Sequence, residues 1–218
     1  AVDNIPGKGR GLVAASKFSA GQLLLCTRAL AVALGGESLE QLGPKLKEAL
    51  SLSGRSVACA VGMLHRQGVP PDGHGTHPAF TPTCWDLLGR SSRSSPLPFL
   101  PLSQNTDAPR FGAEEFSQVL NANALGTTPS ENLEDTVHGL WPLVAMCNHS
   151  NRPTATYSIF GPICVLRAVE DLEAGDELCI SYTPWDSTTT DSSEKLQQVW
   201  GIPVVPMSAD QQQLEAPV

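Results

Sequence analysis

Short apolar segments that are repeatedly interrupted by glycine and proline constrain the fold of this chain most strongly. The 218 residues include 19 glycines and 18 prolines, which is above the average usage of globular proteins. Such frequent interruption favours turns and irregular connections over a helical bundle. The chain is long enough for one domain with a substantial core and too short for two independent enzymes. We therefore expect short strands, long loops and two or three helices.

The charge balance restricts the kind of partner. The chain has 14 Lys and Arg residues against 22 Asp and Glu residues, a formal net charge of −8 at pH 7. This balance argues against direct nucleic-acid binding and suits a basic peptide better, while a role in solubility alone is the simpler explanation. The longest apolar run, over residues 23–34, is interrupted by Thr27 and Arg28 and is too short to cross a bilayer. We expect no membrane partner.

The cysteines are spread along the chain without a CxxC pair: Cys26, Cys59, Cys84, Cys147, Cys164 and Cys179. This spacing is typical of buried small apolar residues in a reducing compartment, which favours an intracellular protein of the cytoplasm or nucleus and leaves an organelle open. The chain begins at Ala1 without an initiator methionine, as a processed or excised fragment would. His74, His77 and Cys84 form an HxxH…C pattern, but zinc would need a fourth ligand, and loop residues without a metal are the preferred interpretation.

Apolar residues at three- and four-residue steps predict the helices. Pro44 precedes such a pattern and predicts a helix with proline at its first position. A second helix is expected over residues 53–68, with Val57, Val61 and Leu64 on one face. A third is expected over residues 114–125. Residues 67–110 are dense in proline, glycine and serine and predict a long irregular insertion.

Three regions predict strands. Residues 7–34 predict two or three short strands, with a turn at residues 19–21. The β-rich segments 154–160 and 163–169 flank Gly161 and Pro162 and predict a hairpin. A last strand is expected over residues 177–182.

The individual motifs have structural explanations as well as functional ones. The glycine-rich GKGRGL opening over residues 7–12 resembles a phosphate-binding loop, but it lacks the Lys-Ser/Thr ending and the full GxGxxG spacing. His149 taken alone is better explained as a structural histidine. Tyr182, at a strand end, is better explained by packing.

The order of the motifs is more specific than any one of them. A GxG turn is followed by an asparagine on a helix, then LVAMCNHSNRP over residues 143–153 and VLRAVEDLEAGDELCISY over residues 165–182. This order resembles the SET-domain protein-lysine methyltransferases, and within them the SET-and-MYND branch, over about residues 7–34 and 111–200. The resemblance implies a mainly β fold with a helical insert, an α+β class called the SET β-clip, with the Asn-His segment threaded as a pseudoknot.

The resemblance also implies domain limits and an activity. Residues 1–200 would form a single SET domain, with 35–110 as a variable insertion and 201–218 as a tail. The activity would be S-adenosyl-L-methionine-dependent methylation of a lysine in a protein or peptide substrate. The acceptor amine must lose its proton, and a nearby sulfonium charge and an apolar channel both lower its pKa, so no dedicated base is required.

Individual residues match the roles of the family. The residues that would bind S-adenosyl-L-methionine are Lys8, Gly9, Arg10, Asn123, Asn148 and His149. Asn123 is chosen over Asn121 because NALG resembles the family's NAFG. Tyr182 would be catalytic, because its hydroxyl can orient the amine and stabilise the polarised methyl group. The candidates for an aromatic channel wall are Phe160, Trp185 and Trp200.

Departures from the family pattern leave a second function open. Asn151 stands where the family often has a zinc-ligating cysteine, Thr154 stands where it has asparagine, and no cysteine follows Cys179. We therefore expect no zinc, and the MYND finger is absent. Ile202 replaces an expected phenylalanine near the adenine. The alternative function is a catalytically inactive SET module that binds or scaffolds a protein, and a generic third reading is an unrelated β-rich nucleotide-binding domain. The sequence carries no signal for an oligomeric state.

Overall fold

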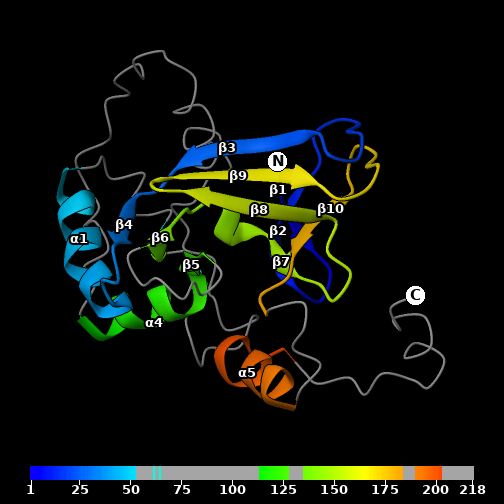
Figure 1. The fold of residues 1–218 in the computed structure, drawn as a ribbon. Coiled ribbons are helices and arrows are strands. Elements are labelled where there is room, and N and C mark those ends of the chain that lie inside the picture. The colour runs from blue at the N-terminus through cyan, green and yellow to red at the C-terminus, as the bar shows by residue number, and fades with distance from the viewer. Residues whose placement is uncertain (53–60, 62–63, 65–112, 128–134, 184–189, 203–218) are drawn as a thin grey trace, which may run out of the picture.

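The computed structural model describes residues 1–52, 61, 64, 113–127, 135–183 and 190–202. In this part of the chain, short strands form three small sheets with helices packed at one side (Figure 1). The predicted mainly β fold with helices is confirmed. The predicted irregular insertion over 67–110 lies outside the described residues.

The first sheet joins segments from the two halves of the chain. Its N-terminal hairpin turns at Gly7 and Gly9, whose φ angles of 74° and 78° suit glycine. The hairpin's second strand pairs antiparallel with a strand near Ile180, which in turn runs parallel to the segment at His149. The strand order is β1 (Val2–Ile5), β2 (Gly9–Val13), β10 (Glu177–Ile180) and β7 (Asn148–His149). This sheet brings the GxG turn beside the Asn-His segment.

The second sheet contains the predicted hairpin. Its strands, in spatial order, are β3 (Leu23–Arg28), β9 (Ile163–Ala168) and β8 (Ala155–Phe160). The hairpin prediction is confirmed, with Phe160 paired to Ile163 across the Gly161 turn. The prediction that all the cysteines are buried is wrong for Cys26, which is exposed. A register irregularity between Leu23 and Leu25 interrupts the alternation of this strand and turns Cys26 to solvent.

The third sheet packs beside helix α1 (Leu39–Leu52), which in turn contacts helix α4. Its strands, in spatial order, are β4 (Ala31–Leu34), β6 (Val137–Leu140) and β5 (Leu125–Gly126). Helix α4 spans Ala113–Asn123. The predicted helix over 114–125 is therefore two residues too long, because Leu125 pairs with Gly139 in the sheet instead. Both helices pack against each other beside this sheet (Figure 1).

Helix α1 (Leu39–Leu52) begins earlier than Pro44 predicts. The Ser38 backbone N–H donates to the Gln41 side-chain oxygen at 2.8 Å, which is one half of a capping box. This cap sets the start, and Pro44 lies in the second turn, where it removes one helical hydrogen bond. Leu42 and Leu46 are fully buried and anchor the helix despite this loss. Of the predicted helix over 53–68, only Val61 and Leu64 are described, and both are buried.

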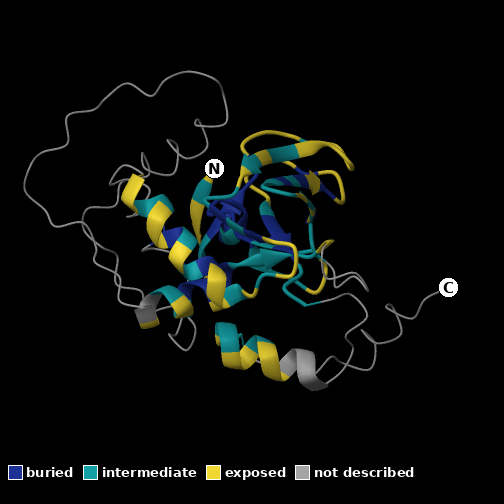
Figure 2. Cartoon of the chain, turned by 60° about the vertical axis from the view of Figure 1, so that its left-hand side comes forward, coloured by how far each residue is buried: buried dark blue, intermediate teal, exposed yellow. Residues whose placement is uncertain are grey.

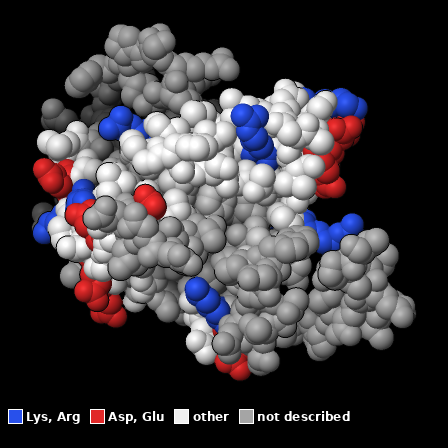
Figure 3. Space-filling model, viewed as in Figure 1, with Lys and Arg blue, Asp and Glu red and all other residues white. Residues whose placement is uncertain are grey.

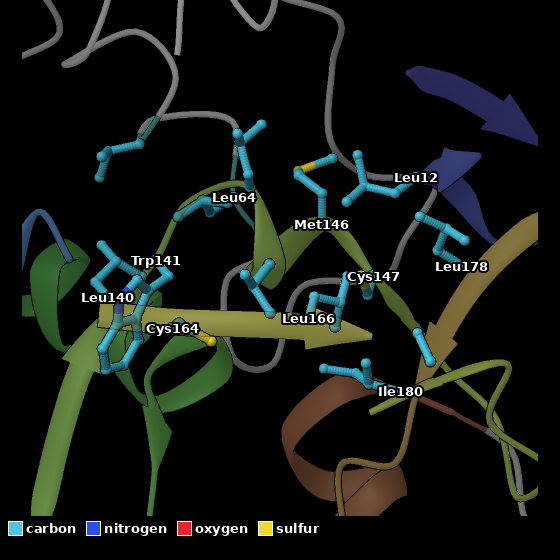
Figure 4. Packing of buried hydrophobic residues seen from close by; sticks show 14 of the residues in the cluster. Leu12, Leu64, Leu140, Trp141, Met146, Cys147, Cys164, Leu166, Leu178 and Ile180 are labelled. Atoms are coloured by element: carbon cyan, nitrogen blue, oxygen red, sulfur yellow. The ribbon is translucent and has the colours of Figure 1, made fainter. Parts of the chain in front are cut away.

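One hydrophobic core joins the three sheets. Buried residues gather where the sheets meet, and exposed residues follow the outer faces of the helices (Figure 2). Side chains from different elements converge on this core, among them Leu12, Trp141, Cys147, Leu166 and Ile180 (Figure 4). Burying each large side chain contributes about 1.5–3 kcal/mol to folding. The Trp141 indole N–H donates to the Pro162 carbonyl at 3.1 Å, so its polar group is satisfied.

Three cysteines belong to this core, as predicted. Cys147, Cys164 and Cys179 are all buried. Burial raises the pKa of Cys164 to about 12, and burial together with the charge of Glu177 raises the pKa of Cys179 to about 11. Burial also raises the pKa of Cys147. These thiols are therefore protonated at neutral pH and act as packing groups. None of the helices in the described part is long and apolar enough to cross a membrane.

Candidate active site

The apolar segment that precedes Asn148 and His149 is buried in the core. Its residues Val144–Met146 form a short 3-10 helix, η3, and one residue, Cys147, separates this helix from β7. Asn148 and His149 then pair in parallel with Cys179 and Ile180. The Ser150 N–H donates to the Ile180 carbonyl at 3.0 Å and continues the ladder by one bond. The abrupt change from apolar to polar residues thus marks the exit of the chain from the core.

Tyr182 follows β10 and is held at two points. The strand ends at Ile180, two residues before its predicted end. The Tyr182 hydroxyl donates to the Cys147 carbonyl at 2.7 Å, and the Tyr182 backbone N–H donates to His149 Nδ1 at 3.1 Å. Burial, with smaller contributions from nearby acidic groups, raises the pKa of Tyr182. The hydroxyl is therefore protonated at neutral pH, and its proton is engaged by Cys147.

His149 uses both ring nitrogens. Its Nδ1 accepts from Tyr182, and its Nε2 lies 2.9 Å from Asn151 Oδ1. Burial lowers the pKa of His149, and the charge of Lys8 lowers it further, against an opposing contribution from the Asn151 hydrogen bond. The imidazole is therefore neutral at physiological pH. The ring centroids of His149 and Tyr182 are 5.3 Å apart, so the two rings also pack together.

Glu177 links the GxG turn to the Asn-His segment. One carboxylate oxygen accepts from Lys8 Nζ at 2.7 Å, and the other accepts from Asn148 Nδ2 at 2.8 Å. Burial raises the pKa of Glu177, but the hydrogen bonds from Lys8 and Asn148 outweigh it and the net pKa is lowered. Our sequence interpretation did not include Glu177. Its place in GDEL, at the start of the strand that ends in Tyr182, is the signal that could have identified it.

The rest of the GxG turn lies on β2. Gly9 and Arg10 pair with Ile5 and Asn4 of the first strand. Burial lowers the pKa of Arg10. A Cβ atom added at the next residue, Gly11, would lie 2.7 Å from Asn148 Nδ2. The backbone of the turn therefore approaches Asn148 as closely as a glycine allows.

Asn123 is the last residue of helix α4. Its side chain is 5% exposed, whereas Asn121 is exposed, and its amide nitrogen donates to the Val119 carbonyl at 2.8 Å. Trp200, the last residue of α5 (Thr190–Trp200), donates from its indole N–H to the Ala122 carbonyl at 2.7 Å. The Trp200 ring also lies 4.8 Å from the Tyr182 ring, measured between centroids. Trp200 thus connects the end of α4 with Tyr182.

The other aromatic candidates lie elsewhere. Phe160 is 66% exposed at the turn of the β8–β9 hairpin, at the end of these strands that lies away from β10 (Figure 1). It is therefore not a wall of the Tyr182 site, because a hairpin turn projects its side chains to solvent. Trp185 lies outside the described residues. Of the three predicted wall residues, Trp200 alone is placed beside Tyr182 in the described part of the chain.

No metal site is found in the described part of the chain, and the face drawn in Figure 3 shows no basic band. Its histidines, cysteines and acidic residues form no group of three or more that could hold a metal ion. The HxxH…C residues lie outside the described ranges, so the absence of zinc stays a prediction. On the face seen in Figure 3, the basic side chains of the described residues are scattered and interspersed with acidic ones.

The arrangement of these segments agrees with a family assignment. Residues 9–183 match the family model of the SET domain. The chain belongs to the SET-domain family. The match includes the β2 strand, the Asn-His segment and Tyr182, so the predicted family is confirmed. It covers most of the chain.

Individual relatives place this SET domain near the SMYD proteins. A protein named Methyltransferase from Gibberella zeae is 29% identical over 194 residues, which are 82% of this chain and 26% of that protein. Histone-lysine N-methyltransferase SMYD3 of Homo sapiens is 32% identical over 84 residues, which are 38% of this chain and 19% of that protein. The chain thus spans only about a quarter or less of the length of these relatives.

A solved structure aligns with this chain at low similarity. The SET domain of LSMT, crystallised with lysine and AdoHcy, is 13% identical, with a TM-score of 0.42. The alignment covers 94% of this chain and 52% of that chain.

Proposed function

We propose that this SET domain transfers a methyl group from S-adenosyl-L-methionine to a lysine side chain of a protein. The observation that carries this proposal is the position of Tyr182: its hydroxyl is buried, protonated and fixed by Cys147, beside the Asn-His segment. Relatives named Methyltransferase and Histone-lysine N-methyltransferase SMYD3 support the same reaction class. The substrate is proposed to be a lysine within a protein or peptide.

The orientation of Tyr182 suits the acceptor side of this reaction. Because its proton is donated to the Cys147 carbonyl, the phenol oxygen presents its lone pairs to other partners. It can accept a hydrogen bond from a lysine amine and direct the amine lone pair along the line of transfer. The same oxygen stabilises the positive charge of the methyl group during displacement. Because its raised pKa keeps the hydroxyl protonated at neutral pH, Tyr182 has no phenolate to take a proton from the amine, so it serves as an orienting group and not as a base.

The glycine turn fits the cofactor that the family uses. A bound S-adenosyl-L-methionine would supply a sulfonium methyl donor. The residues proposed to hold it are Lys8, Gly9, Arg10, Asn123, Asn148 and His149. A Cβ at Gly7 would meet no atom of the described residues within 4 Å, so none of these residues blocks a ligand from the backbone of the turn there. Because the Lys8 side chain is paired with Glu177, we assign its contribution to the backbone and not to the ammonium group.

We also propose that residues 1–200 form one SET domain with a 201–218 tail, and that the 35–110 insertion selects the protein substrate. The described part of this insertion includes α1, which packs against α4 beside the third sheet. This helix, near the start of the insertion, joins the insertion to the domain core. A substrate array tested against the chain with and without substitutions in 35–110 would show whether specificity changes.

Calorimetry and labelled transfer test the proposal together. The purified chain is titrated with S-adenosyl-L-methionine and then incubated with the labelled cofactor and a cell lysate. We expect micromolar binding and transfer of label to lysine residues. Tyr182→Phe is expected to bind the cofactor and to lose transfer. Cofactor binding by the wild-type chain without transfer to any polypeptide would contradict the enzyme and favour the protein-binding module.

A further inference from the structure

The hydrogen bond from the Tyr182 backbone reveals the tautomer of His149. A backbone N–H can donate a hydrogen bond but cannot accept one. Since the Tyr182 N–H points at His149 Nδ1 at 3.1 Å, Nδ1 must lack a proton. The ring proton of the neutral imidazole is then on Nε2, which lies 2.9 Å from Asn151 Oδ1. The amide oxygen of Asn151 therefore accepts a hydrogen bond from His149 Nε2–H.

This arrangement fixes Tyr182 beyond the end of the sheet. The β7–β10 ladder includes Ile180, and its last bond runs from Ser150 to Ile180. Tyr182 lies two residues further along. Its backbone is held by the His149 side chain, and its ring is held by the Cys147 carbonyl. A five-residue segment, 147–151, thus holds the tyrosine at both its main chain and its hydroxyl.

The neutral amide at position 151 matters for this arrangement. A carboxylate there would stabilise the imidazolium form, which carries protons on both nitrogens. An imidazolium could not accept the Tyr182 N–H. Lys8, in the turn between β1 and β2, is a charged group that lowers the pKa of His149, and its ammonium is paired with Glu177 of β10. The protonated Tyr182, which follows β10, packs its ring on the imidazole.

We propose that Asn151 is a positioning residue: it holds His149 in the Nε2–H tautomer so that Nδ1 accepts the Tyr182 backbone N–H and fixes the tyrosine. The effect on catalysis rests on the proposed methyltransferase function, whereas the tautomer and the fixation of Tyr182 do not. Asn151 occupies the position where the related family pattern often has cysteine. In this chain, an amide hydrogen bond to His149 would stabilise the segment at that position.

Nitrogen NMR of the histidine side chains in the full chain tests this directly. The chain has five histidines, and His149→Asn identifies the signal of His149. We expect the Nε2–H tautomer and a pKa below 6.5 in the wild type. In Asn151→Asp, we expect the His149 pKa to rise, Nδ1 to become protonated and amide hydrogen exchange at Tyr182 to accelerate at least about tenfold near pH 6.

Three further variants separate positioning from general destabilisation. Asn151→Ala is expected to weaken the tautomer preference without raising the His149 pKa above 6.5, and Asn151→Gln is expected to restore part of it. Gln22→Glu makes the same amide-to-carboxylate change at an exposed residue of another sheet region and is expected to leave the His149 signal unchanged.

Activity measurements extend the test. The acidic limb of the methyl-transfer pH profile is expected to move to higher pH in Asn151→Asp and to stay in place in Gln22→Glu. A wild-type Nδ1–H tautomer, or an Asn151→Asp variant with unchanged His149 pKa and unchanged Tyr182 exchange, would overturn the positioning role. The predicted NMR behaviour in a protein that transfers no methyl group would instead support the positioning role and contradict the proposed function.

Discussion

The two ends of strand β10 are held by different chemistry. At its start, Glu177 joins Lys8 and Asn148 through an ionised carboxylate. Beyond its end, Tyr182 is held by a neutral imidazole and a carbonyl. The charged end is partly exposed, with side chains of Lys8 and Glu177 at 45% and 19% exposure, while burial raises the pKa of the tyrosine. In the function proposed above, the first end would assemble the cofactor side of the site and the second would position the reacting groups.

The largest expected effect is at the neutral end. Tyr182→Phe removes the hydroxyl and leaves the aromatic ring, which contacts His149 and Trp200. We expect methyl transfer to fall about a hundredfold or more, because an orienting and charge-stabilising group is lost. Cofactor affinity is expected to change little. Steady-state kinetics and calorimetry of the same preparation measure the two effects, and unchanged kcat would contradict the role of Tyr182.

A packing substitution at the charged end is expected to rank second. In Gly11→Ala, the new Cβ would lie 2.7 Å from both Asn148 Nδ2 and Ile5 Cγ1. We expect the free energy of unfolding to fall by about 1–3 kcal/mol, and cofactor binding to weaken, because Asn148 must move. Urea denaturation measures the stability.

Gly43→Ala is the matched control for this substitution. Gly43 lies within helix α1, and among the described residues its Cβ would meet only Leu120 Cδ1, at 3.9 Å. This variant is expected to be about 0.5–1 kcal/mol more stable than the wild type. Equal effects of the two alanines would show that the close approach at Gly11 has no energetic consequence.

Removal of the carboxylate charge is expected to have a smaller effect. In Glu177→Gln, the ion pair with Lys8 is lost while an amide oxygen can still accept from Asn148. We expect the free energy of unfolding to fall by only about 1 kcal/mol, because solvent screens the exposed ammonium of Lys8. The loss should be smaller at high salt.

The pH dependence of this variant gives a second readout. The pKa of Glu177 lies below its usual 4.5, so its stabilising contribution is present above pH 4.5 and is lost as the pH falls through the lowered value. Glu177→Gln should lack this acid loss. Glu173→Gln is the control, because its ion pair with Lys17 is exposed on both sides, and it should match the wild type.

The smallest expected effect is the titration of the neutral end. The folded state lowers the pKa of His149 below 6.5, so the unfolded chain binds this proton more tightly. Stability is therefore full above pH 6.5 and falls as the pH drops through the lowered pKa. Thermal unfolding between pH 7 and pH 5 measures the slope. In His149→Asn the slope should be shallower, and an identical slope in both proteins would refute the assignment.

Local patterns predicted the parts of the fold that depend on neighbours in sequence. The hairpin at Gly161 and the helix that ends near Asn123 were found in this way, because turn residues and apolar spacing act over a few positions. The start of α1 was also encoded locally, in Ser38 and Gln41, whereas Pro44 predicted a later start. The exposure of Cys26 follows from a strand irregularity that its sequence does not signal.

The site depends more on contacts between distant segments. Order and spacing of the motifs pointed to Asn148, His149 and Tyr182, which the structure brings together. The link through Glu177 joins residues 8, 148 and 177, and it exists only because β10 lies between β2 and β7. The contact of Trp200 with Tyr182 likewise depends on how α5 docks on α4. No local pattern contains such pairings.

Hydrogen exchange with and without S-adenosyl-L-methionine tests most directly whether both ends of β10 belong to one cofactor site. The account predicts that cofactor slows exchange together in residues 7–12, in residues 147–151 and around Tyr182, while the β8–β9 turn at Gly161 is unchanged. Binding that protects none of these segments, or protects the β8–β9 turn in their place, would contradict it.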